Sequence, residues 1–342
     1  MKKFKTIMFA SMMALLVAGC SNKEEVEPAE ATDQTPEEQV ITYPTPFSGE
    51  QVEQEVTNRP VLVTINNQVE ARPQSGLSSA DVVYEMLAEG DVTRLLALFQ
   101  SDIPESVGPI RSARSYFIDV AKGLDAFYIA HGYSPEAKSM LASGVVDNIN
   151  GMAYDGTLFI RSKDRVAPHN SYMPGENIEA SMEKVGASML YTKKVSYAFY
   201  DEQESVKIGE SANKVNVNYS QMDSFNSTYT FSQASGTYGR SNGNSVTTDL
   251  LTNEPIDISN ILFFEMQHSF VDSYGRRDID ITSGGKAYVA QQGSIREVQW
   301  EQQDGLLVAT ETDGSQVKLV PGLTWIHFVP TSPGIASSVT YQ

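Results

Sequence analysis

Cysteine is nearly absent from this chain of 342 residues, which contains only Cys20. A single thiol excludes an internal disulfide, so stability must come from ordinary core packing. Histidine is also scarce, with four residues and no His-Glu-x-x-His spacing. The sequence therefore predicts neither a bound metal nor a cofactor.

Positive charge is in short supply, with 25 Lys and Arg residues against 43 Asp and Glu residues and a formal net charge of -18. A strongly acidic surface excludes nucleic acid as a partner, because nucleic-acid binding requires basic patches. It also argues against a general attraction to anionic lipids or wall polyanions. Any anionic ligand would have to be recognised by a local group of cations against the overall field.

The chain lacks an apolar run that could span a bilayer, which takes roughly 20 residues. Residues 1–19 instead have the charged start and short apolar stretch of an export signal peptide. The sequence Leu-Val-Ala-Gly-Cys that ends at Cys20 resembles a bacterial lipobox, in which the cysteine is acylated. We therefore expect Cys20 to anchor the protein by lipid to the outer, extracytoplasmic face of the cell membrane. The alternative is an ordinary signal peptide that is cut elsewhere.

Residues 20–58 are predicted to form a disordered acidic tether. Ten acidic residues and one lysine fall in this stretch, which has almost no apolar periodicity. Such a composition buries too little apolar surface to offset the entropy of ordering. A flexible chain of this length has an r.m.s. span of roughly 35 Å.

Residues 59–195 are predicted to form a mixed α/β domain. Short β-branched runs indicate strands, and apolar residues at three- and four-residue intervals indicate helices. Ser134 as N-cap and Pro135 at the first position mark the start of one helix. The expected elements are a strand at 60–67, a hairpin over 80–102 that turns at Glu89-Gly90-Asp91, a helix over 110–125, a strand at 126–132, and helices at 134–144 and 175–189.

Residues 196–342 are predicted to form a β-rich, mostly antiparallel domain, which makes the fold class α+β. Segments of alternating character are separated by Asn-Gly, Gln-Gly and Asp-Gly turns. The expected strands are 195–200, 214–220, 227–233, 261–272, 277–282, 286–293, 294–300, 305–311, 316–322 and 324–330.

Several stretches resemble the YerB-like family of Gram-positive lipoproteins. The most specific are ARPQSGLSSADVVYE, VTRLLALFQSD, VGPIRSARSYFIDVA, RVAPHNSY, RRDIDITSGGKAYVAQQGSIREVQWE and LVPGLTWIHFVP. The resemblance covers roughly residues 60–330 and implies a lipobox, a mixed α/β N-terminal region and a β-rich C-terminal region. That family has no established activity, so the resemblance implies location and architecture but no chemistry.

Candidate ligand-binding residues lie in the first domain. GPIRSARSYF places Arg111 and Arg114 on one face of the expected helix, near free N–H groups that bind anions. His131 follows a strand, and the loop RVAPHN contains polar residues of a kind enriched in function. We predict an anion-binding pocket of Arg111, Arg114, His131 and His169, with Arg165 beside it and Arg94 and Arg161 as further candidates.

The competing interpretation is internal pairing. Four carboxylates are close enough in sequence to pair with Arg111 and Arg114 in a buried network: Glu85, Glu89, Asp119 and Asp125. His268 and His327, on strand patterns, are predicted to be core residues. Ser283 fits Ser-x-x-Lys, but it lies between two strands, and the Lys-Thr-Gly of penicillin-binding enzymes is absent from the sequence. Ser283 is therefore predicted to be a turn residue.

The sequence favours a membrane-anchored binding or protein-interaction module of the cell envelope. Its expected partner is either a small anionic ligand or an envelope protein. No catalytic residue is assigned, and an enzyme is the less favoured class. The alternative is a hydrolase or transferase that acts on cell-wall material.

Overall fold

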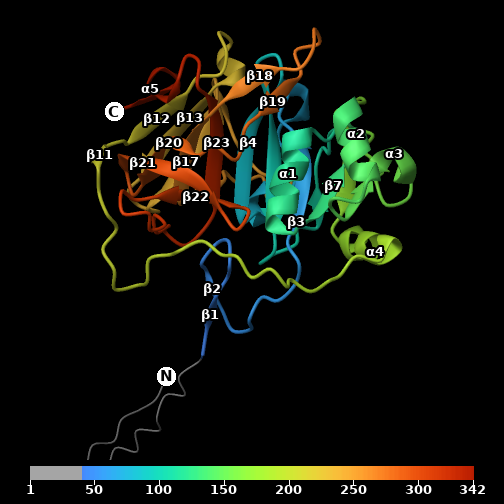
Figure 1. Cartoon of the computed structure of the whole chain (residues 1–342), viewed down its shortest axis with the longest axis horizontal. Coiled ribbons are helices and arrows are strands. Elements are labelled where there is room, and N and C mark those ends of the chain that lie inside the picture. The colour runs from blue at the N-terminus through green and yellow to red at the C-terminus, as the bar shows by residue number, and fades with distance from the viewer. Residues whose placement is uncertain (1–40) are drawn as a thin grey trace, which may run out of the picture. The chain divides into compact units, whose positions relative to one another are not determined.

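A single mixed sheet of 11 strands runs through both halves of the chain (Figure 1). The structure, a computed structural model, describes residues 41–342, so the predicted signal peptide and Cys20 lie outside the described residues. In order across the sheet, the strands are β11 (Glu210–Ser211), β21 (Ser294–Gln303), β20 (Gly285–Gln291), β17 (Asn260–Met266), β23 (Thr324–Pro330), β4 (Val82–Glu89), β5 (Val92–Phe99), β3 (Val61–Asn66), β7 (Phe127–Ala130) and β8 (Asn148–Asn150), with β22 (Leu306–Thr310) beside β21.

Most α-helices of the described residues fall in the first half of the chain, which confirms the prediction of an α+β fold with a β-rich second half. The helices are α1 (Ser115–Leu124), α2 (Pro135–Ala142), α3 (Gly151–Tyr154), α4 (Glu176–Val185) and α5 (Ile335–Ser338). Local signals explain the start of α2. The Ser134 hydroxyl accepts a hydrogen bond from the Ala137 N–H at 3.2 Å, and Pro135 is the first helical residue.

The strands nearest the candidate site end at one edge of the large sheet. β3, β7 and β8 are parallel neighbours, and β17, β23 and β4 form a second parallel group. β5 lies between the two groups and is antiparallel to both β3 and β4, so the groups point in the same direction. The carboxyl ends of all six strands therefore lie at one edge, which we call the carboxyl edge. Ligands commonly bind at such edges.

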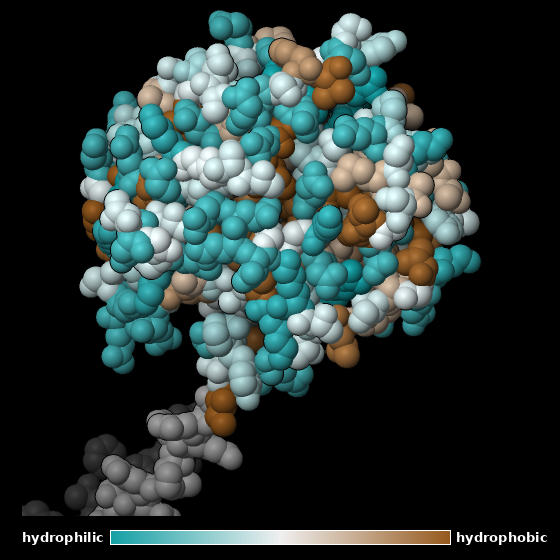
Figure 2. Space-filling view, viewed as in Figure 1, coloured by the Kyte–Doolittle hydropathy of each residue, from teal (hydrophilic) through white to brown (hydrophobic). Residues whose placement is uncertain are grey.

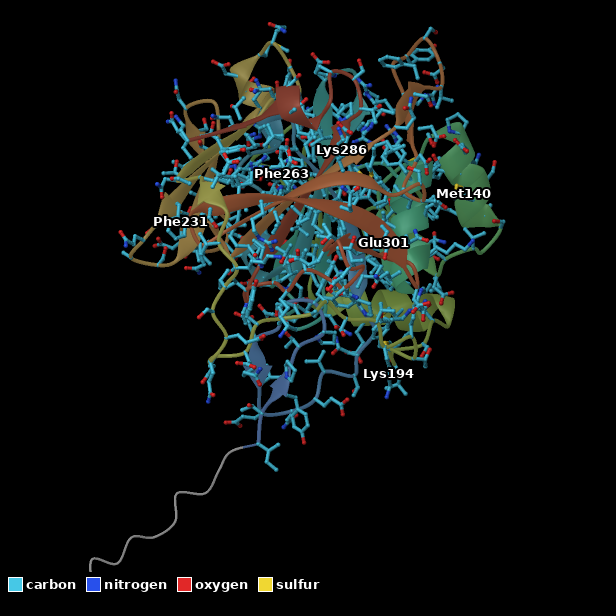
Figure 3. All side chains as sticks on the ribbon, turned by 60° about the vertical axis from the view of Figure 1, so that its left-hand side comes forward. Met140, Lys194, Phe231, Phe263, Lys286 and Glu301 are labelled. Atoms are coloured by element: carbon cyan, nitrogen blue, oxygen red, sulfur yellow. The ribbon has the colours of Figure 1, made fainter. Side chains whose placement is uncertain are left out.

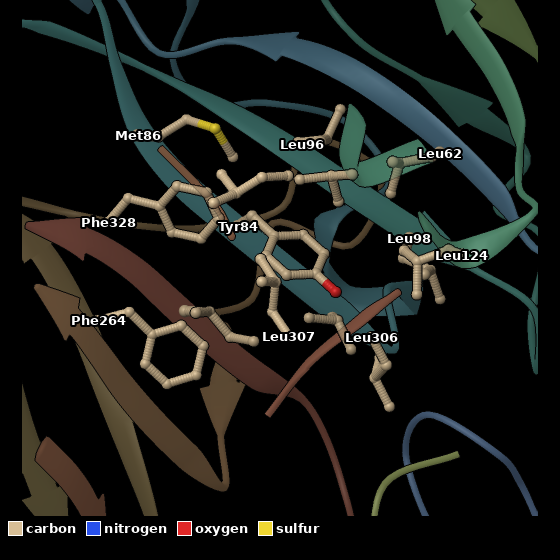
Figure 4. Close-up of a cluster of buried hydrophobic side chains, with 14 of the residues drawn as sticks. Leu62, Tyr84, Met86, Leu96, Leu98, Leu124, Phe264, Leu306, Leu307 and Phe328 are labelled. Atoms are coloured by element: carbon tan, nitrogen blue, oxygen red, sulfur yellow. The ribbon is translucent and has the colours of Figure 1, made fainter. Parts of the chain in front are cut away.

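One face of the middle of the large sheet packs against α1 and against β22, which is itself a strand of this sheet. Tyr84 and Leu98 from the centre of the sheet share a buried cluster with Leu124 of α1 and Leu306 of β22 (Figure 4). None of these four side chains is more than 1% exposed. Val83 belongs to the cluster on the opposite face, because successive side chains of a strand point to opposite faces.

A second sheet covers the opposite face. Its strands are β15 (Ser245–Val246), β14 (Thr237–Asn242), β13 (Ser227–Ser232), β12 (Lys214–Val217) and β24 (Val339–Tyr341), with β16 (Asp257–Ile258) beside β14. Phe263 of β17 lies in the cluster between the two sheets, and Phe231 of β13 packs at its margin (Figure 3). The smaller sheets are β6 (Ser106–Val107), β10 (Ser171–Pro174) and β9 (Ile160–Arg161), then β18 (His268–Phe270) with β19 (Arg277–Ile279), and β1 (Tyr43–Pro44) with β2 (Gln51–Val52).

The fold begins earlier than predicted, because residues 41–58, assigned to the tether, have described structure. β1 and β2 form a small hairpin, and Phe47 between them is fully buried. Its ring centroid lies 6.1 Å from that of Tyr191 and 6.3 Å from that of Tyr197. Burying a phenylalanine side chain contributes about 1.5–3 kcal/mol. This one aromatic residue therefore docks an otherwise polar stretch onto the core.

The helix α1 begins at Ser115, later than predicted. The residues before it are extended, and Ile110 pairs with Ile65 in an isolated bridge. The position of Ile110 in the sequence fits the spacing of a buried helix face. In the structure, however, Ile110 is buried because its extended segment pairs with β3. Arg111 lies outside the helix and Arg114 is its N-cap residue, so the predicted shared helix face does not exist.

Two predicted strands, 195–200 and 316–322, are irregular segments that make only isolated bridges. Phe199 pairs with Leu319, and Gln316 pairs with Thr310. The division of the chain at residues 195 and 196 remains a prediction. Residues 41–342 cluster as one unit, and the large sheet crosses that division.

Candidate functional site

An extended segment, residues 108–113, crosses the carboxyl edge above β3 and β7. The Arg111 N–H donates to the Thr64 carbonyl at 2.9 Å, and the His131 N–H donates to the Arg111 carbonyl at 2.9 Å. The Ile110 N–H donates to the Ser171 carbonyl at 2.6 Å. These three backbone bonds place Arg111 between the end of β3 and the end of β7.

The Arg111 side chain is a cation without a counter-charge. Among residues 41–342 it has neither a hydrogen bond nor an ion pair, and its buried Nε has no partner. Burial and the positive charge of Arg94 lower the pKa of Arg111 to about 10. Arg111 is nonetheless charged at neutral pH, in a chain whose net charge is -18.

Arg114 is instead paired internally. Its guanidinium bonds to Glu89, and its Nη1 donates to the Ala113 carbonyl at 2.6 Å. Arg94 shares the same carboxylate, with 2.7 Å between its Nη2 and Glu89 Oε2. The internal pairing that the sequence offers as the competing interpretation is therefore present at Arg114, and ligand binding by Arg114 stays a prediction.

His131 is held as a neutral imidazole with a defined tautomer. Its Nε2 lies 3.0 Å from Arg161 Nη2, and its Nδ1 lies 2.7 Å from the Ser171 hydroxyl. A guanidinium can only donate, so Nε2 accepts and the ring proton is on Nδ1. Burial and the charge of Arg161 lower the pKa of His131 below its usual range. Arg161 is itself neutralised by Asp155, with a shortest contact of 3.0 Å.

This geometry limits the chemistry of His131 and Ser171. Because Nδ1 donates its proton to the Ser171 oxygen, His131 cannot accept a proton from that hydroxyl. Ser171 is also only 1% exposed, so a substrate could not reach its hydroxyl without a rearrangement. The pair therefore does not form the nucleophile and base of a serine hydrolase.

His169 is brought to the same edge by Asn66, the last residue of β3. The Asn66 Oδ1 accepts a hydrogen bond from the Gln68 N–H at 3.0 Å, which fixes the orientation of the amide. The Asn66 Nδ2 therefore donates to His169 Nδ1, at 2.9 Å. With Nδ1 as an acceptor, neutral His169 carries its proton on Nε2, which is then a hydrogen-bond donor.

Arg165, predicted to lie beside the ligand, has a different role. Its Nη1 bonds to the Ala71 carbonyl and its Nη2 donates to the Pro73 carbonyl at 2.6 Å. Arg165 thus anchors the loop after β3. The structure brings Arg111, His131 and His169 to the carboxyl edge, whereas the side chains of Arg114 and Arg165 are already bonded elsewhere.

Gly151, the first residue of α3, is expected to control the position of His131. A Cβ added at Gly151 would lie 2.3 Å from His131 Nδ1. Gly151→Ala should therefore displace the ring, break its bond to Ser171, and lower the free energy of unfolding by about 1–3 kcal/mol. Urea unfolding and the NMR signal of the imidazole Nδ1–H would test this. Gly239→Ala is the control, because a Cβ there meets nothing within 4 Å, and an unchanged Nδ1–H signal in Gly151→Ala would contradict the expectation.

A second polar cluster, fully buried, was not found from the sequence. Glu85 of β4 is 0% exposed, and its Oε2 accepts from Arg240 Nη2 at 2.8 Å and from Trp325 Nε1 at 3.0 Å. Burial alone would raise the pKa of Glu85, but Arg240 and the surrounding donors hold it below its usual range. The Arg240 guanidinium also lies 4.7 Å from the centre of the Trp325 ring. This cluster joins the large sheet to the second sheet.

His327 completes this cluster and is the core residue that the sequence predicts. The Tyr219 hydroxyl donates to the Phe328 carbonyl, so its oxygen accepts from His327 Nδ1 at 3.1 Å. The Tyr229 hydroxyl donates to Nε2 at 2.6 Å. Burial lowers the pKa of His327 to about 4, so the ring is neutral at pH 7. His268 has its Nδ1 2.9 Å from the Met266 carbonyl.

The remaining sequence predictions concern residues away from the carboxyl edge. Ser283 lies in an exposed turn before β20 and donates to the carbonyl of Gly284, as expected of a turn residue. Between residues 41 and 342, no helix is both long and apolar enough to cross a bilayer. The same residues contain no group of three or more His, Cys, Asp or Glu side chains suited to a metal ion.

Comparison with models of known protein families shows the family to which the chain belongs. A family described as "Protein of unknown function (DUF3048) N-terminal domain" matches residues 47–188, and the corresponding C-terminal domain matches residues 215–326. The chain therefore belongs to the DUF3048 family.

Its relatives confirm the resemblance to YerB. The Bacillus subtilis (strain 168) protein named "Putative lipoprotein YerB" is 39% identical over 332 residues, which is 96% of each chain. The crystal structure of the YerB protein from Bacillus subtilis has a TM-score of 0.80 and 40% identity to this chain, and the match covers 88% of this chain and 99% of that chain.

Proposed function

We propose that this protein is a lipoprotein of the cell envelope that binds a small anionic ligand at Arg111. The YerB relative is named a lipoprotein, and the lipobox-like sequence that ends at Cys20 supports the same for this chain. Acylated Cys20 would anchor the protein to the outer face of the membrane. The acidic residues after Cys20 would link this anchor to the fold, which begins by residue 41.

The observation that carries the proposal is the uncompensated charge of Arg111. A partly buried guanidinium is costly unless its charge is paired, and the other arginines near it, Arg94 and Arg161, both have carboxylate partners. Arg111 lies at the carboxyl ends of parallel strands, where ligands of α/β sheets bind. Its planar fork suits two parallel hydrogen bonds to a carboxylate or phosphate.

The neighbours of Arg111 favour a ligand with little charge. His131 is neutral, so it adds no second full positive charge, and His169 offers a neutral N–H donor. The net charge of -18 would repel a polyanion. We therefore infer that the ligand is a small anion and not a wall polymer.

Thermal melting of the purified protein against a panel of wall fragments and simple anions tests this site. A ligand at 100 times its Kd adds about 2.7 kcal/mol to the free energy of unfolding, which raises Tm by a few degrees. We expect one compound to raise the Tm of the wild type and to have no effect on Arg111→Gln. Without ligand, Arg111→Gln should melt at or above the wild-type Tm, because it removes an unpaired buried charge.

Arg296→Gln is the matched control. Arg296 pairs with Glu311 at 3.1 Å, so this variant should melt lower than the wild type and keep the full ligand shift. An equal ligand shift in Arg111→Gln would contradict the proposal. So would a large drop in its Tm without ligand, because that would make Arg111 a structural cation.

A further inference from the structure

The hairpin formed by β18 and β19 presents apolar side chains to solvent. We call residues 270–277, which include the turn of this hairpin, the hairpin tip. Its Phe270, Val271 and Tyr274 side chains are 65%, 55% and 79% exposed. Single exposed apolar residues are ordinary, but a group of three on one turn marks an interaction surface. Figure 1 shows the hairpin at the opposite end of the described fold from β1 and β2.

Two arginines accompany these apolar residues. The Arg277 guanidinium lies 4.4 Å from the centre of the Phe270 ring, and the Arg276 guanidinium lies 5.4 Å from that of Tyr274. Arg276 is paired with Asp272 at 2.6 Å. Arg277 donates to the Gly90 carbonyl at 2.9 Å but has no ion pair within residues 41–342, and its buried Nε is unpartnered. The hairpin tip therefore combines exposed aromatic rings with one unpaired cation.

A pocket lies beside the hairpin tip. Its volume is about 210 Å³, and Val271, Arg277, Pro135 and Ser115 are among its lining residues. The pocket lies between the hairpin and the first residues of α1 and α2. In the view of Figure 2, apolar residues appear among polar ones at this end of the molecule. The space suits one apolar side chain, and Arg277 at its wall suits a carboxylate beside that side chain.

We propose that the hairpin tip is a docking surface for an acidic segment of a partner protein. An aromatic or aliphatic side chain of that segment fills the pocket, and a neighbouring carboxylate pairs with Arg277. Exposed Tyr, Phe and Arg next to a pocket are the residues and the geometry of protein-interface hot spots. The unpaired charge of Arg277 is what selects an acidic partner, because the rest of this acidic chain would repel one. This surface is separate from the proposed ligand site at Arg111.

Selection from a random-peptide library displayed on phage, with the purified full-length protein as bait, tests the docking surface. We expect enrichment of peptides that contain an aromatic or aliphatic residue next to Asp or Glu. A labelled copy of the enriched peptide should bind Arg277→Glu and Tyr274→Ser about tenfold or more weakly than the wild type. Tyr274 is 79% exposed, so Tyr274→Ser should leave the fold intact. Arg277→Glu loses the hydrogen bond to the Gly90 carbonyl, so a thermal melt is needed to verify that this variant is folded.

Two control variants separate this surface from others. Val166→Ser removes an apolar side chain that is 80% exposed, and Arg111→Gln removes the proposed ligand site, so peptide binding should survive both. Enrichment of basic peptides, or of peptides that bind Arg277→Glu as tightly as the wild type, would overturn the proposal. Failure to enrich any peptide would also overturn it. So would Arg277-dependent binding to vesicles of anionic phospholipid, or self-association that Tyr274→Ser abolishes, because a membrane or a second copy would then occupy the surface.

Discussion

Replacing Glu85 with Gln is expected to lower the free energy of unfolding by about 3–5 kcal/mol. The amide keeps the shape of the side chain, but it leaves the Arg240 guanidinium without its counter-charge. Arg240 is only 2% exposed, so water cannot stabilise the charge in place of Glu85. Urea unfolding of the wild type and of Glu85→Gln would measure the difference. It is the largest effect that we expect from a single substitution.

Two controls test whether the loss of stability comes from the unpaired buried charge of Arg240. Glu204→Gln breaks the exposed pair with Lys318 and should change the free energy of unfolding little, because water screens that pair. The double variant Glu85→Leu/Arg240→Met removes both charges and should recover most of the lost stability. A Glu85→Gln variant as stable as the wild type would show that the buried ion pair contributes nothing.

Acidification from pH 6.5 to about pH 4.5 is expected to destabilise the protein by about 2 kcal/mol through His327 alone. Burial lowers the pKa of this histidine to about 4, from an ordinary value of 6.5. The unfolded chain therefore binds a proton in this range that the folded chain does not. The contribution of neutral His327 to the free energy of unfolding is fully present well above pH 6.5. It falls as the pH falls and levels off below pH 4. His268, whose pKa burial also lowers to about 4, adds a loss over the same range of pH.

Urea unfolding at pH 7 and at pH 4.5 would measure this loss. His327→Gln should lower stability at both pH values and remove the part of the pH dependence that comes from His327. His268→Gln, the comparison variant, should remove only the part that comes from His268. Carboxylates with lowered pKa values, such as Glu311, lose their contribution mainly at lower pH, so they do not produce the change in this window. A pH dependence that is identical in His327→Gln and the wild type would contradict the assignment.

Local signals in the sequence are sufficient for much of the fold. The Glu89-Gly90-Asp91 turn marks the hairpin of β4 and β5, and Ser134 with Pro135 marks the start of α2. These elements are determined by residues near them in the chain. The extended segment before α1 was missed because its conformation depends on a distant partner. Ile110 pairs with Ile65 of β3, and nothing in the spacing of nearby apolar residues reports that pairing.

The candidate site was predicted in part for the same reason. The sequence points to Arg111 from an expected helix start, to His131 from the end of a strand and to His169 from a polar loop. Whether an arginine is free or paired depends on contacts that spacing does not reveal. Arg165 bonds to the Ala71 carbonyl, 94 residues away, and the partner of Glu85 is Arg240, 155 residues away. The sequence offers Glu85 as a partner for Arg111 or Arg114, but its ion-pair partner is Arg240, in the second half of the chain.

The position of β23 has a consequence for the order of folding. This strand comes late in the chain, yet it lies between β17 and β4 near the middle of the large sheet. Its Trp325 bonds to Glu85 across 240 residues. Until β23 is available, β4 has an open edge and Glu85 lacks its hydrogen bond from Trp325. The first half should therefore be unable to complete its fold during synthesis, and the whole chain should fold slowly, as proteins rich in long-range strand pairs do.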